Sequence, residues 1–400
     1  MIPRLKPTIG VRELVAAFQL PRRDDVERFE QSFAELMGQK YALAFPYGRT
    51  GLMLLLEALG LKDKEIICPA YTCVVVPHAI TYSGNKPVFI DCEEGGFNMD
   101  LNIAEHAINE KTGAIIATSL FGYPVNMDRL DEIRKRHPNI FIIQDCAHSF
   151  AATWNGKPVQ KEGIAALFGL NISKILTSIF GGMITTDNED VYRKLKTMRE
   201  QRLKKPGWGK GLRRLLYLLA VYPAFWEPVY GLINRLERLG VLNYFVKYYD
   251  DAKIDMPSDY KVKMSPIEAR VGMIQINKYE NIIRARRKYA SYYKLNLQND
   301  ILIKSANKVE ASTHSQIVAL IDQREFVLKE ALKMGVQFGI VLEYCVPNMK
   351  VYNKIDKSNI YANATYYAEH IINLPVCGKF KEKDARKVVH TLKTFLPKII

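Results

Sequence analysis

Between residues 41 and 187 short apolar runs alternate with segments of helical periodicity. In the helical segment 127–137, Leu130 and Ile133 fall on one face and charged residues cover the other. The apolar runs predict strands at 65–68, 87–91, 114–120, 140–145, 165–170 and 182–186. Because alternating strands and helices favour a parallel sheet, we expect an α/β fold whose mostly parallel central sheet is wrapped by helices. Ligands should bind beyond the carboxyl ends of its strands.

The pattern changes after Arg199. Residues 201–250 are rich in Leu, Tyr, Trp and Arg, and long amphipathic helices resume from Lys263 onward. A strand at 316–321 and helices at 324–334 and 381–396 are predicted near the end of the chain. The sequence therefore predicts a large domain over 1–260, interrupted by an insertion at about 203–250, and a small C-terminal α+β domain over 261–400.

Composition and charge limit the function classes. The chain has 57 Lys+Arg against 42 Asp+Glu, a formal net charge of +15, and 48% hydrophobic residues, which is typical of a globular protein. An acidic partner is consistent with this charge, but no nucleic-acid reading motif accompanies it, so nucleic acid is not expected. Residues 1–25 lack the apolar core of a secretory signal, and we expect a cytoplasmic protein.

The six cysteines are scattered singly and show no spacing that indicates a disulfide framework or a metal site. We therefore expect free thiols in a reducing compartment and no bound metal. These residues are Cys68, Cys73, Cys92, Cys146, Cys345 and Cys377.

Three features could carry chemistry. Asp145 ends the strand 140–145, Lys174 follows the strand 165–170, and Gly48-Arg49-Thr50-Gly51 opens a predicted helix whose amides could bind phosphate. Alone each is weak, because the acid could cap a helix and the lysine could be a surface residue. Together they are the parts that a pyridoxal phosphate enzyme needs. The lysine holds the aldehyde as an imine, and the acid keeps the pyridine nitrogen protonated.

Several short segments, in order along the chain, resemble the sugar aminotransferases of the DegT/DnrJ/EryC1/StrS family, which are homodimeric pyridoxal phosphate enzymes of fold type I. The resemblance covers most of residues 30–200 and 260–395. The matching segments are GRTGL at 48–52, CPAYTC at 68–73, PVFID at 87–91, FGYPVNMD at 121–128, DCAHS at 145–149, SK at 173–174, GGMITTD at 181–187 and MSPIEA at 264–269.

The resemblance implies roles for individual residues. Lys174 is similar to the family's Schiff-base lysine and Asp145 to the partner of the pyridinium nitrogen. His148 falls where the family has Gln or His, near the cofactor's phenolic oxygen. The alternative for His148 is a structural histidine on a helix face.

The resemblance also implies the residues that hold the phosphate. Gly48, Arg49 and Thr50 resemble the segment whose backbone amides bind it. Lys263 resembles a lysine that reaches the phosphate of the partner subunit, although a solvated surface lysine is the open alternative. Ser173 directly precedes the lysine of the imine.

Two residues near the cofactor depart from the family pattern. Cys73 stands where the family usually has an aromatic residue stacked on the ring, and cysteine can pack there but cannot stack. Gly169 stands where the family has a serine whose hydroxyl contacts the phosphate. We therefore expect fewer contacts to the cofactor than in other members of the family. The segment 342–347, which could line the substrate pocket, also departs from the family.

The insertion is the third departure. It begins with basic residues and continues uncharged over 215–226, which is too short to span a bilayer. One interpretation is an interfacial helix with its basic residues toward lipid headgroups, giving a peripheral contact at the inner face of the membrane. The other is an apolar flap over the active site or a dimer contact. The basic residues are Arg202, Lys204, Lys205, Lys210, Arg213 and Arg214.

We therefore expect an aminotransferase that transfers an amino group, from glutamate, to a ketosugar linked to a nucleotide or lipid phosphate in surface polysaccharide or glycan biosynthesis. A non-sugar carbonyl, such as a cyclitol ketone or an amino acid, is an alternative substrate. A membrane-associated member of the fold without catalysis is the alternative from another class.

Overall fold

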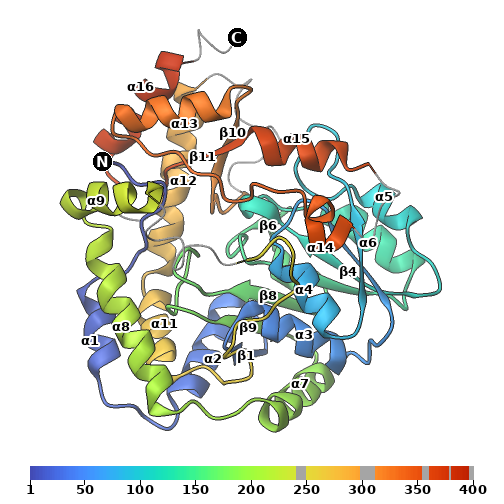
Figure 1. Ribbon diagram of the computed structural model, residues 1–400. Coiled ribbons are helices and arrows are strands. Elements are labelled where there is room, and N and C mark those ends of the chain that lie inside the picture. Colours follow the sequence, from blue (N-terminus) through green and yellow to red (C-terminus); the bar gives the residue numbers. More distant parts are fainter. Residues whose placement is uncertain (240–248, 298–310, 354–359, 378–379, 396–400) are drawn as a thin grey trace.

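A seven-stranded sheet forms the centre of the protein in the computed structural model, which describes residues 1–239, 249–297, 311–353, 360–377 and 380–395 (Figure 1). Its strand order is β1-β9-β8-β5-β4-β2-β3, in which β8, β5, β4, β2 and β3 run parallel and β9 is antiparallel to both its neighbours. The expected mostly parallel sheet is confirmed. The strands are β1 (Tyr41–Phe45), β2 (Glu65–Pro69), β3 (Lys86–Ile90), β4 (Thr112–Thr118), β5 (Phe141–Asp145), β8 (Ala165–Gly169) and β9 (Gly182–Thr186).

Helices cover both faces of this sheet, which is why its strands are apolar throughout. Successive residues point to opposite faces, so Ile66 and Ile116 belong to one buried cluster and Ile67 and Ile115 to the other. The first cluster includes residues of α3 (Gly48–Ala58), α4 (Val75–Tyr82) and α7 (Glu189–Arg202). The second includes residues of α2 (Asp25–Met37), α5 (Leu101–His106), α6 (Met127–Arg136) and α11 (Pro266–Ile276).

The C-terminal part has its own small core. The antiparallel pair β10 (Ile317–Leu320) and β11 (Ile371–Leu374) packs with α12 (Tyr279–Asn296), α13 (Arg324–Lys333) and α16 (Glu382–Phe395), which Figure 1 shows gathered beside it. Helix α11 packs with α2 on the central sheet and not with this small core. Its Arg270 donates to the Asp25 carboxylate of α2 at 2.8 Å. The division of the chain at residue 260 stays a prediction.

Up to residue 239, the insertion contains the helices α8 (Trp208–Ala224) and α9 (Glu227–Arg238). α8 lies against α1 (Val11–Phe18) and α11 (Figure 1). All six cysteines are free thiols, and only Cys73 among them is partly exposed. The remaining elements are the hairpin β6 (Thr153–Trp154) and β7 (Lys157–Pro158), the helices α14 (Lys350–Asn353) and α15 (Ala362–His370), and the short turns η1 (Leu120–Gly122), η2 (Val159–Lys161) and η4 (Val346–Asn348).

Candidate active site

Asp145 is held rigidly at the carboxyl end of β5. Its buried carboxylate accepts the Ala147 N–H at 3.0 Å and the Thr118 hydroxyl at 3.3 Å. No helix begins within residues 146–158, all of which the structure describes, so the carboxylate does not cap a helix. An acid fixed in this way at the edge of a parallel sheet is available to a ligand.

Lys174 is brought to this carboxylate from the turn after β8, which is the parallel neighbour of β5. Its backbone N–H donates to the Asn171 carbonyl at 3.0 Å, which closes the turn. Burial lowers the pKa of Lys174, while Cys73 and Asp145 nearby act in the opposite direction. Burial likewise raises the pKa of Asp145, and Lys174 opposes this. The structure thus unites three of the predicted residues, Lys174, Asp145 and Cys73.

His148 lies next to this pair and not on a helix. Its Nδ1 is 3.2 Å from the Phe121 N–H, and its ring stacks on the Phe121 ring with an interplanar angle of 10°. Burial lowers the pKa of His148 well below its usual range, and the charge of Lys174 adds to the effect. A neutral imidazole that accepts at Nδ1 carries its hydrogen on Nε2, so His148 can donate one hydrogen bond into the site.

Three glycines meet where α3 begins. A Cβ atom on Gly182 would lie 2.3 Å from the Gly48 nitrogen, and Gly182 pairs in register with Gly169 of β8. A Cβ on Gly169 would lie 3.1 Å from Cε of Lys174. The Thr50 N–H donates to the Tyr47 carbonyl at 3.1 Å. The amides at the start of a helix point toward its N-terminal end, so this side-chain-free corner beside Lys174 has the properties of a phosphate cradle.

The other predicted cofactor residues have partners of their own. Thr50 donates its hydroxyl to the Tyr260 carbonyl at 3.3 Å, and Nη1 of Arg49 lies 3.5 Å from the Asp255 carbonyl. The exposed Ser173 donates its hydroxyl to Oδ1 of Asn171 at 2.7 Å. Lys263 forms an ion pair with Glu200 of α7. Thr50 and Arg49 therefore lie at the start of α3, beside the cradle, whereas the Lys263 side chain is directed to α7. The role of Lys263 in a partner subunit stays a prediction.

The C-terminal segment 342–347 lies beside the site as its sequence suggested. The Val346 N–H donates to the Ala70 carbonyl at 2.9 Å, and the Tyr344 hydroxyl accepts the Val74 N–H at 3.2 Å. These contacts place the segment against the loop that carries Cys73. Tyr249 adds a further polar side chain here, since its hydroxyl donates to Oε1 of Glu343 at 2.9 Å.

The sequence analysis missed the residues that support the cradle from behind. Tyr47, directly before the cradle, donates its hydroxyl to Oδ1 of Asp259 at 2.5 Å. Arg214 of α8 donates to Oδ2 of Asp259 at 2.9 Å, to Oε1 of Glu268 at 2.8 Å and to the Tyr47 hydroxyl at 3.1 Å. Its guanidinium lies 4.3 Å from the centre of the Phe180 ring. These residues are far apart in the sequence, so only the fold reveals the network.

This network corrects the lipid-facing interpretation for two of the six basic residues of the insertion. Arg214 is buried, and so is Lys210, whose Nζ donates to the carbonyls of Val262 and Lys263 at 2.8 Å each. The basic residues Lys204, Lys205 and Arg213 are exposed, as predicted.

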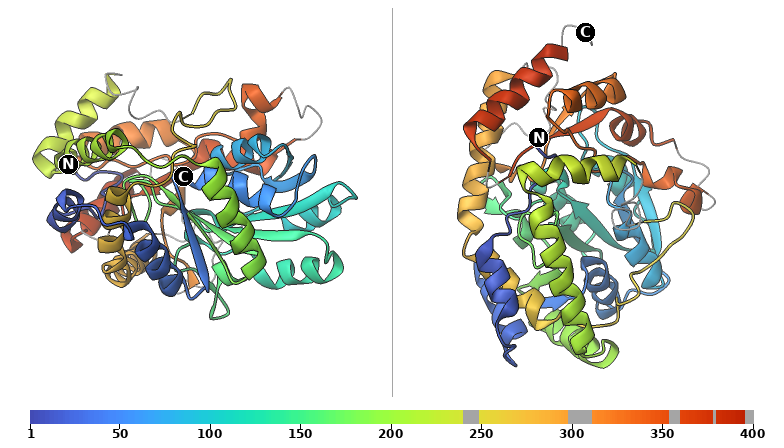
Figure 2. Two further views of the ribbon diagram at one scale, coloured as in Figure 1. Left: turned by 90° about the horizontal axis from the view of Figure 1, so that it is seen from below. Right: turned by 60° about the vertical axis from the view of Figure 1, so that its left-hand side comes forward.

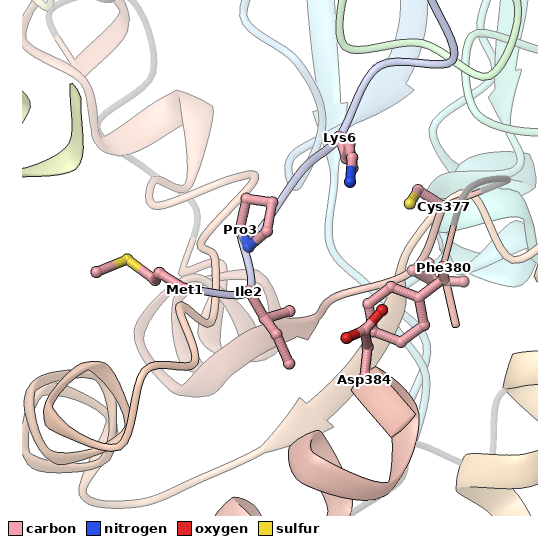
Figure 3. Close-up of a pocket in the computed structure, with 8 residues that line it drawn as sticks. Met1, Ile2, Pro3, Lys6, Cys377, Phe380 and Asp384 are labelled. Atoms are coloured by element: carbon pink, nitrogen blue, oxygen red, sulfur yellow. The ribbon is translucent and has the colours of Figure 1, made fainter. Parts of the chain in front are cut away.

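A pocket close to the N-terminus is separate from these residues (Figure 3). Figure 3 shows the Lys6 ammonium and the Asp384 carboxylate at its margin. It contains none of the predicted site residues, and its lining residues are Met1, Ile2, Pro3, Lys6, Val376, Cys377, Phe380 and Asp384.

Comparison with known proteins decides the family. The sequence model of the DegT/DnrJ/EryC1/StrS aminotransferase family matches residues 10–393. The chain belongs to this family. Family membership, the fold type and the aminotransferase class expected from the sequence are thereby confirmed, and pyridoxal phosphate is the cofactor of this family.

Individual relatives are similar at low identity. An uncharacterized protein of Methanocaldococcus jannaschii is 26% identical over 98% of this chain and 97% of its own length. The GDP-perosamine synthase of Escherichia coli O157:H7 is 28% identical over 71% of this chain and 66% of its own length. Among solved structures, the Streptococcus pneumoniae protein Spr1654, described as a sugar aminotransferase, superposes with a TM-score of 0.79 at 21% identity. That alignment covers the whole of both chains.

Proposed function

We propose that this protein is a pyridoxal phosphate-dependent aminotransferase that transfers an amino group from glutamate to a ketosugar carried by a nucleotide or lipid phosphate. The product would enter surface polysaccharide or another glycan. The observation that carries the proposal is the placement of Lys174 beside Asp145, next to the glycine corner at the start of α3. The GDP-perosamine synthases among its relatives support a nucleotide-linked sugar.

The described residues fit the cofactor. Pyridoxal phosphate supplies an aldehyde, which reacts with amines, and a ring that accepts electrons. The lack of side chains on Gly169 and Gly182 brings the start of α3 into close contact with β8 and β9 beside Lys174, and a Cβ on Gly182 would push the Gly48 nitrogen away. The amides at this end of α3 would hold the phosphate. Asp145 would hold the proton on the ring nitrogen, because its buried carboxylate is stabilised by a cation placed opposite it.

Lys174 is suited to hold the aldehyde and to move the substrate proton. Because burial lowers its pKa, a larger fraction of the amine is neutral near pH 7 than for a surface lysine. A neutral amine is both the nucleophile that binds an aldehyde and the base that accepts a proton from carbon. His148 would orient the cofactor by donating from Nε2.

The substrate pocket would be formed by the loop of Cys73 and the segment 342–347. Glu343 and Tyr344 contact Tyr249 at the end of the insertion, so polar groups able to bind sugar hydroxyls lie at this part of the site. We also propose a homodimer, in which Lys263 of each subunit reaches the other's phosphate. The cytoplasmic location expected from the sequence stays a prediction.

A half-reaction assay tests the function. The holoenzyme is converted to its pyridoxamine form with glutamate, the glutamate is removed, and GDP-, UDP- and dTDP-linked ketosugars are added in turn. A matching ketosugar should restore the visible absorbance of the pyridoxal form and yield an amino sugar by mass spectrometry. Lys174→Ala and the corresponding sugars without a keto group are the controls.

Two results contradict the proposal. If 2-oxo acids or cyclitol ketones restore the absorbance and no ketosugar does, the substrate class is wrong. If borohydride reduction of the holoenzyme attaches the cofactor to a peptide without Lys174, the assignment of the lysine is wrong.

A further inference from the structure

Two neighbouring helices each expose an apolar face that the proposed function does not use. On α1, Val11 (63% exposed), Val15 and Phe18 share one face, and on α8, Trp208 (85% exposed), Leu212, Leu216 and Leu219 share another. We call these seven residues the outer face. Large exposed apolar patches on a protein mark sites of interaction with another molecule or a membrane.

The opposite sides of the same helices pack against each other. Leu14 and Ala17 of α1 lie in one cluster with Tyr217 and the fully buried Leu218 of α8. The right-hand view of Figure 2 brings both helices forward, with α1 in blue and α8 in yellow-green beside it. α8 is therefore apolar on two sides, although only one of them is covered by this chain.

Buried ion pairs fix which side of α8 faces outward. Arg214 and Lys210, on its inner side, are bound to Glu268, whose carboxylate is fully buried. Turning the helix so that Leu212 and Leu216 faced inward would separate these charges from their partners, which is strongly unfavourable. This anchoring argues against a flap that closes its apolar side over the active site.

The exposed charges on the two helices themselves are of one sign. α8 contains no acidic residue, and Glu13, the acid of α1, is buried and bound to Lys278 and Gln275. The exposed charges on the two helices are the basic residues Arg12 and Arg213. Lys204 and Lys205 precede α8 and are also exposed. A two-fold contact of this face with its own copy would bring like charges together, whereas an anionic surface complements them.

The dimensions of the segment fit binding on a membrane but not crossing it. Among the described helices none alone is long and apolar enough for a span, while α8 and Val229–Leu236 of α9 pass that test jointly with a bend of 111° between them. Exposed tryptophans stand at both ends of α8, Trp208 before its apolar run and Trp226 (52% exposed) after it. Aromatic rings at the boundary and basic residues beside an apolar face are typical of helices that lie in the plane of the interface.

We propose that the outer face of α1 and α8 docks on the surface of an anionic lipid bilayer, with its apolar side chains inserted at the level of the headgroups and Arg12 and Arg213 toward the lipid charges. The proposal does not depend on the sugar substrate. It places the enzyme at the membrane, where glycan precursors on lipid carriers are assembled.

Vesicle sedimentation with the full-length holoenzyme tests this. The protein should pellet with phosphatidylglycerol vesicles at low salt, less at high salt, and little with phosphatidylcholine vesicles. Tryptophan emission should shift to shorter wavelength on binding, and the shift should vanish in the Trp208→Phe/Trp226→Phe variant, which retains Trp154. Arg213→Glu should weaken binding by about fivefold or more.

Variants of the outer face separate a membrane from a second copy of the chain. Leu212→Glu/Leu216→Glu should abolish vesicle binding while the mass in solution, measured by light scattering, and the transaminase activity stay unchanged. Leu295→Glu is the matched control, because Leu295 is an exposed leucine (84%) on α12. Absence of the native enzyme from every pellet overturns the proposal. So does a loss of the dimer in Leu212→Glu/Leu216→Glu, which would make the outer face a subunit contact.

Discussion

At the scale of single residues, the site is defined by ionisable groups that burial pushes toward neutrality. Burial lowers the pKa of Lys174 and raises that of Asp145, although each group partly restores the charge of the other. Such opposed shifts in neighbouring groups are characteristic of catalytic sites. Because of these shifts, removing the charge of one residue should change the pKa of the other, and this change can be measured.

Asp145→Asn should shift the pH profile of Lys174 downward. The Asp145 carboxylate raises the pKa of the Lys174 ammonium, so removing its charge lets burial lower that pKa further. The amine attacks an aldehyde only when neutral, and therefore the rate of cofactor attachment rises with pH until it levels off above the pKa. In the apo-protein followed by absorbance after mixing with pyridoxal phosphate, this plateau should begin at lower pH in the variant. An unchanged or upward-shifted profile would show that the two groups do not interact.

His148 should act as a hydrogen-bond donor that need not be charged. His148→Gln keeps a donor and should retain most of the transaminase activity. His148→Leu removes it and should lower kcat/KM by about 10- to 100-fold, the cost of one hydrogen bond to a polar partner. Steady-state kinetics of both variants, with melting temperatures as the control for folding, distinguishes them. Equal losses in the two variants would make His148 a packing residue.

Gly182→Ala tests the glycine corner. The new Cβ would lie 2.3 Å from the Gly48 nitrogen, so the start of α3 must move away from β9. We expect a clear rise in the dissociation constant of pyridoxal phosphate, measured by absorbance titration. Gly209→Ala, where a Cβ meets no atom within 4 Å, is the matched control. Unchanged cofactor affinity in Gly182→Ala would remove the cradle assignment.

At the scale of elements, apolar runs predicted six strands of the central sheet, including β3 at one edge, and missed β1 at the other edge. β2, β3, β4, β5, β8 and β9 lie where buried runs stand between turn residues, but β1 at the sheet edge and β11 were not predicted. Both lie next to another element without a long turn between them: β1 is followed closely by the glycine motif, and β11 directly follows α15. The sequence also located Asp145 and Lys174, because each ends or follows such a run. It could not reveal that α8 reaches the cradle, since that contact joins residues far apart in the chain.

Arg214 should contribute more to binding of the cofactor's phosphate than to binding of its ring. Arg214→Ala leaves the buried Glu268 carboxylate without this partner, and we expect a loss of about 3–5 kcal/mol in the free energy of unfolding. Because Arg214 also binds Tyr47 beside the cradle, affinity for pyridoxal phosphate should fall more than affinity for pyridoxal, which lacks the phosphate. Arg214→Lys should be intermediate, since it keeps the charge but loses the forked geometry.

Arg213→Ala is the matched control for Arg214, because this neighbouring arginine of α8 is exposed. In the absence of lipid it should change neither unfolding nor cofactor affinity. If Arg214→Ala weakens the binding of pyridoxal and pyridoxal phosphate equally, the arginine supports the fold but does not position the cradle.

At the scale of the whole molecule, the proposed homodimer depends on which subunit Lys263 serves. The resemblance assigns Lys263 to the other subunit's phosphate, whereas within this chain its ammonium binds Glu200 and its carbonyl accepts from Lys210. These contacts hold the segment that leads into α11 against α7 and α8. They are compatible with a surface lysine as well as with one that bridges subunits, so activity in hybrid dimers has to decide.

A hybrid dimer of one Lys174→Ala subunit and one Lys263→Ala subunit gives opposite results for the two roles. If Lys263 serves the partner, the site containing the intact Lys174 also receives an intact Lys263, and the hybrid should reach about half of the wild-type activity. If Lys263 serves its own subunit, that site carries the defect, and the hybrid should show only half of the activity of the Lys263→Ala dimer. Hybrids isolated through two different affinity tags, with both parental dimers assayed alongside, give this comparison. Wild-type activity in the Lys263→Ala dimer itself would reduce Lys263 to a surface ion pair with Glu200.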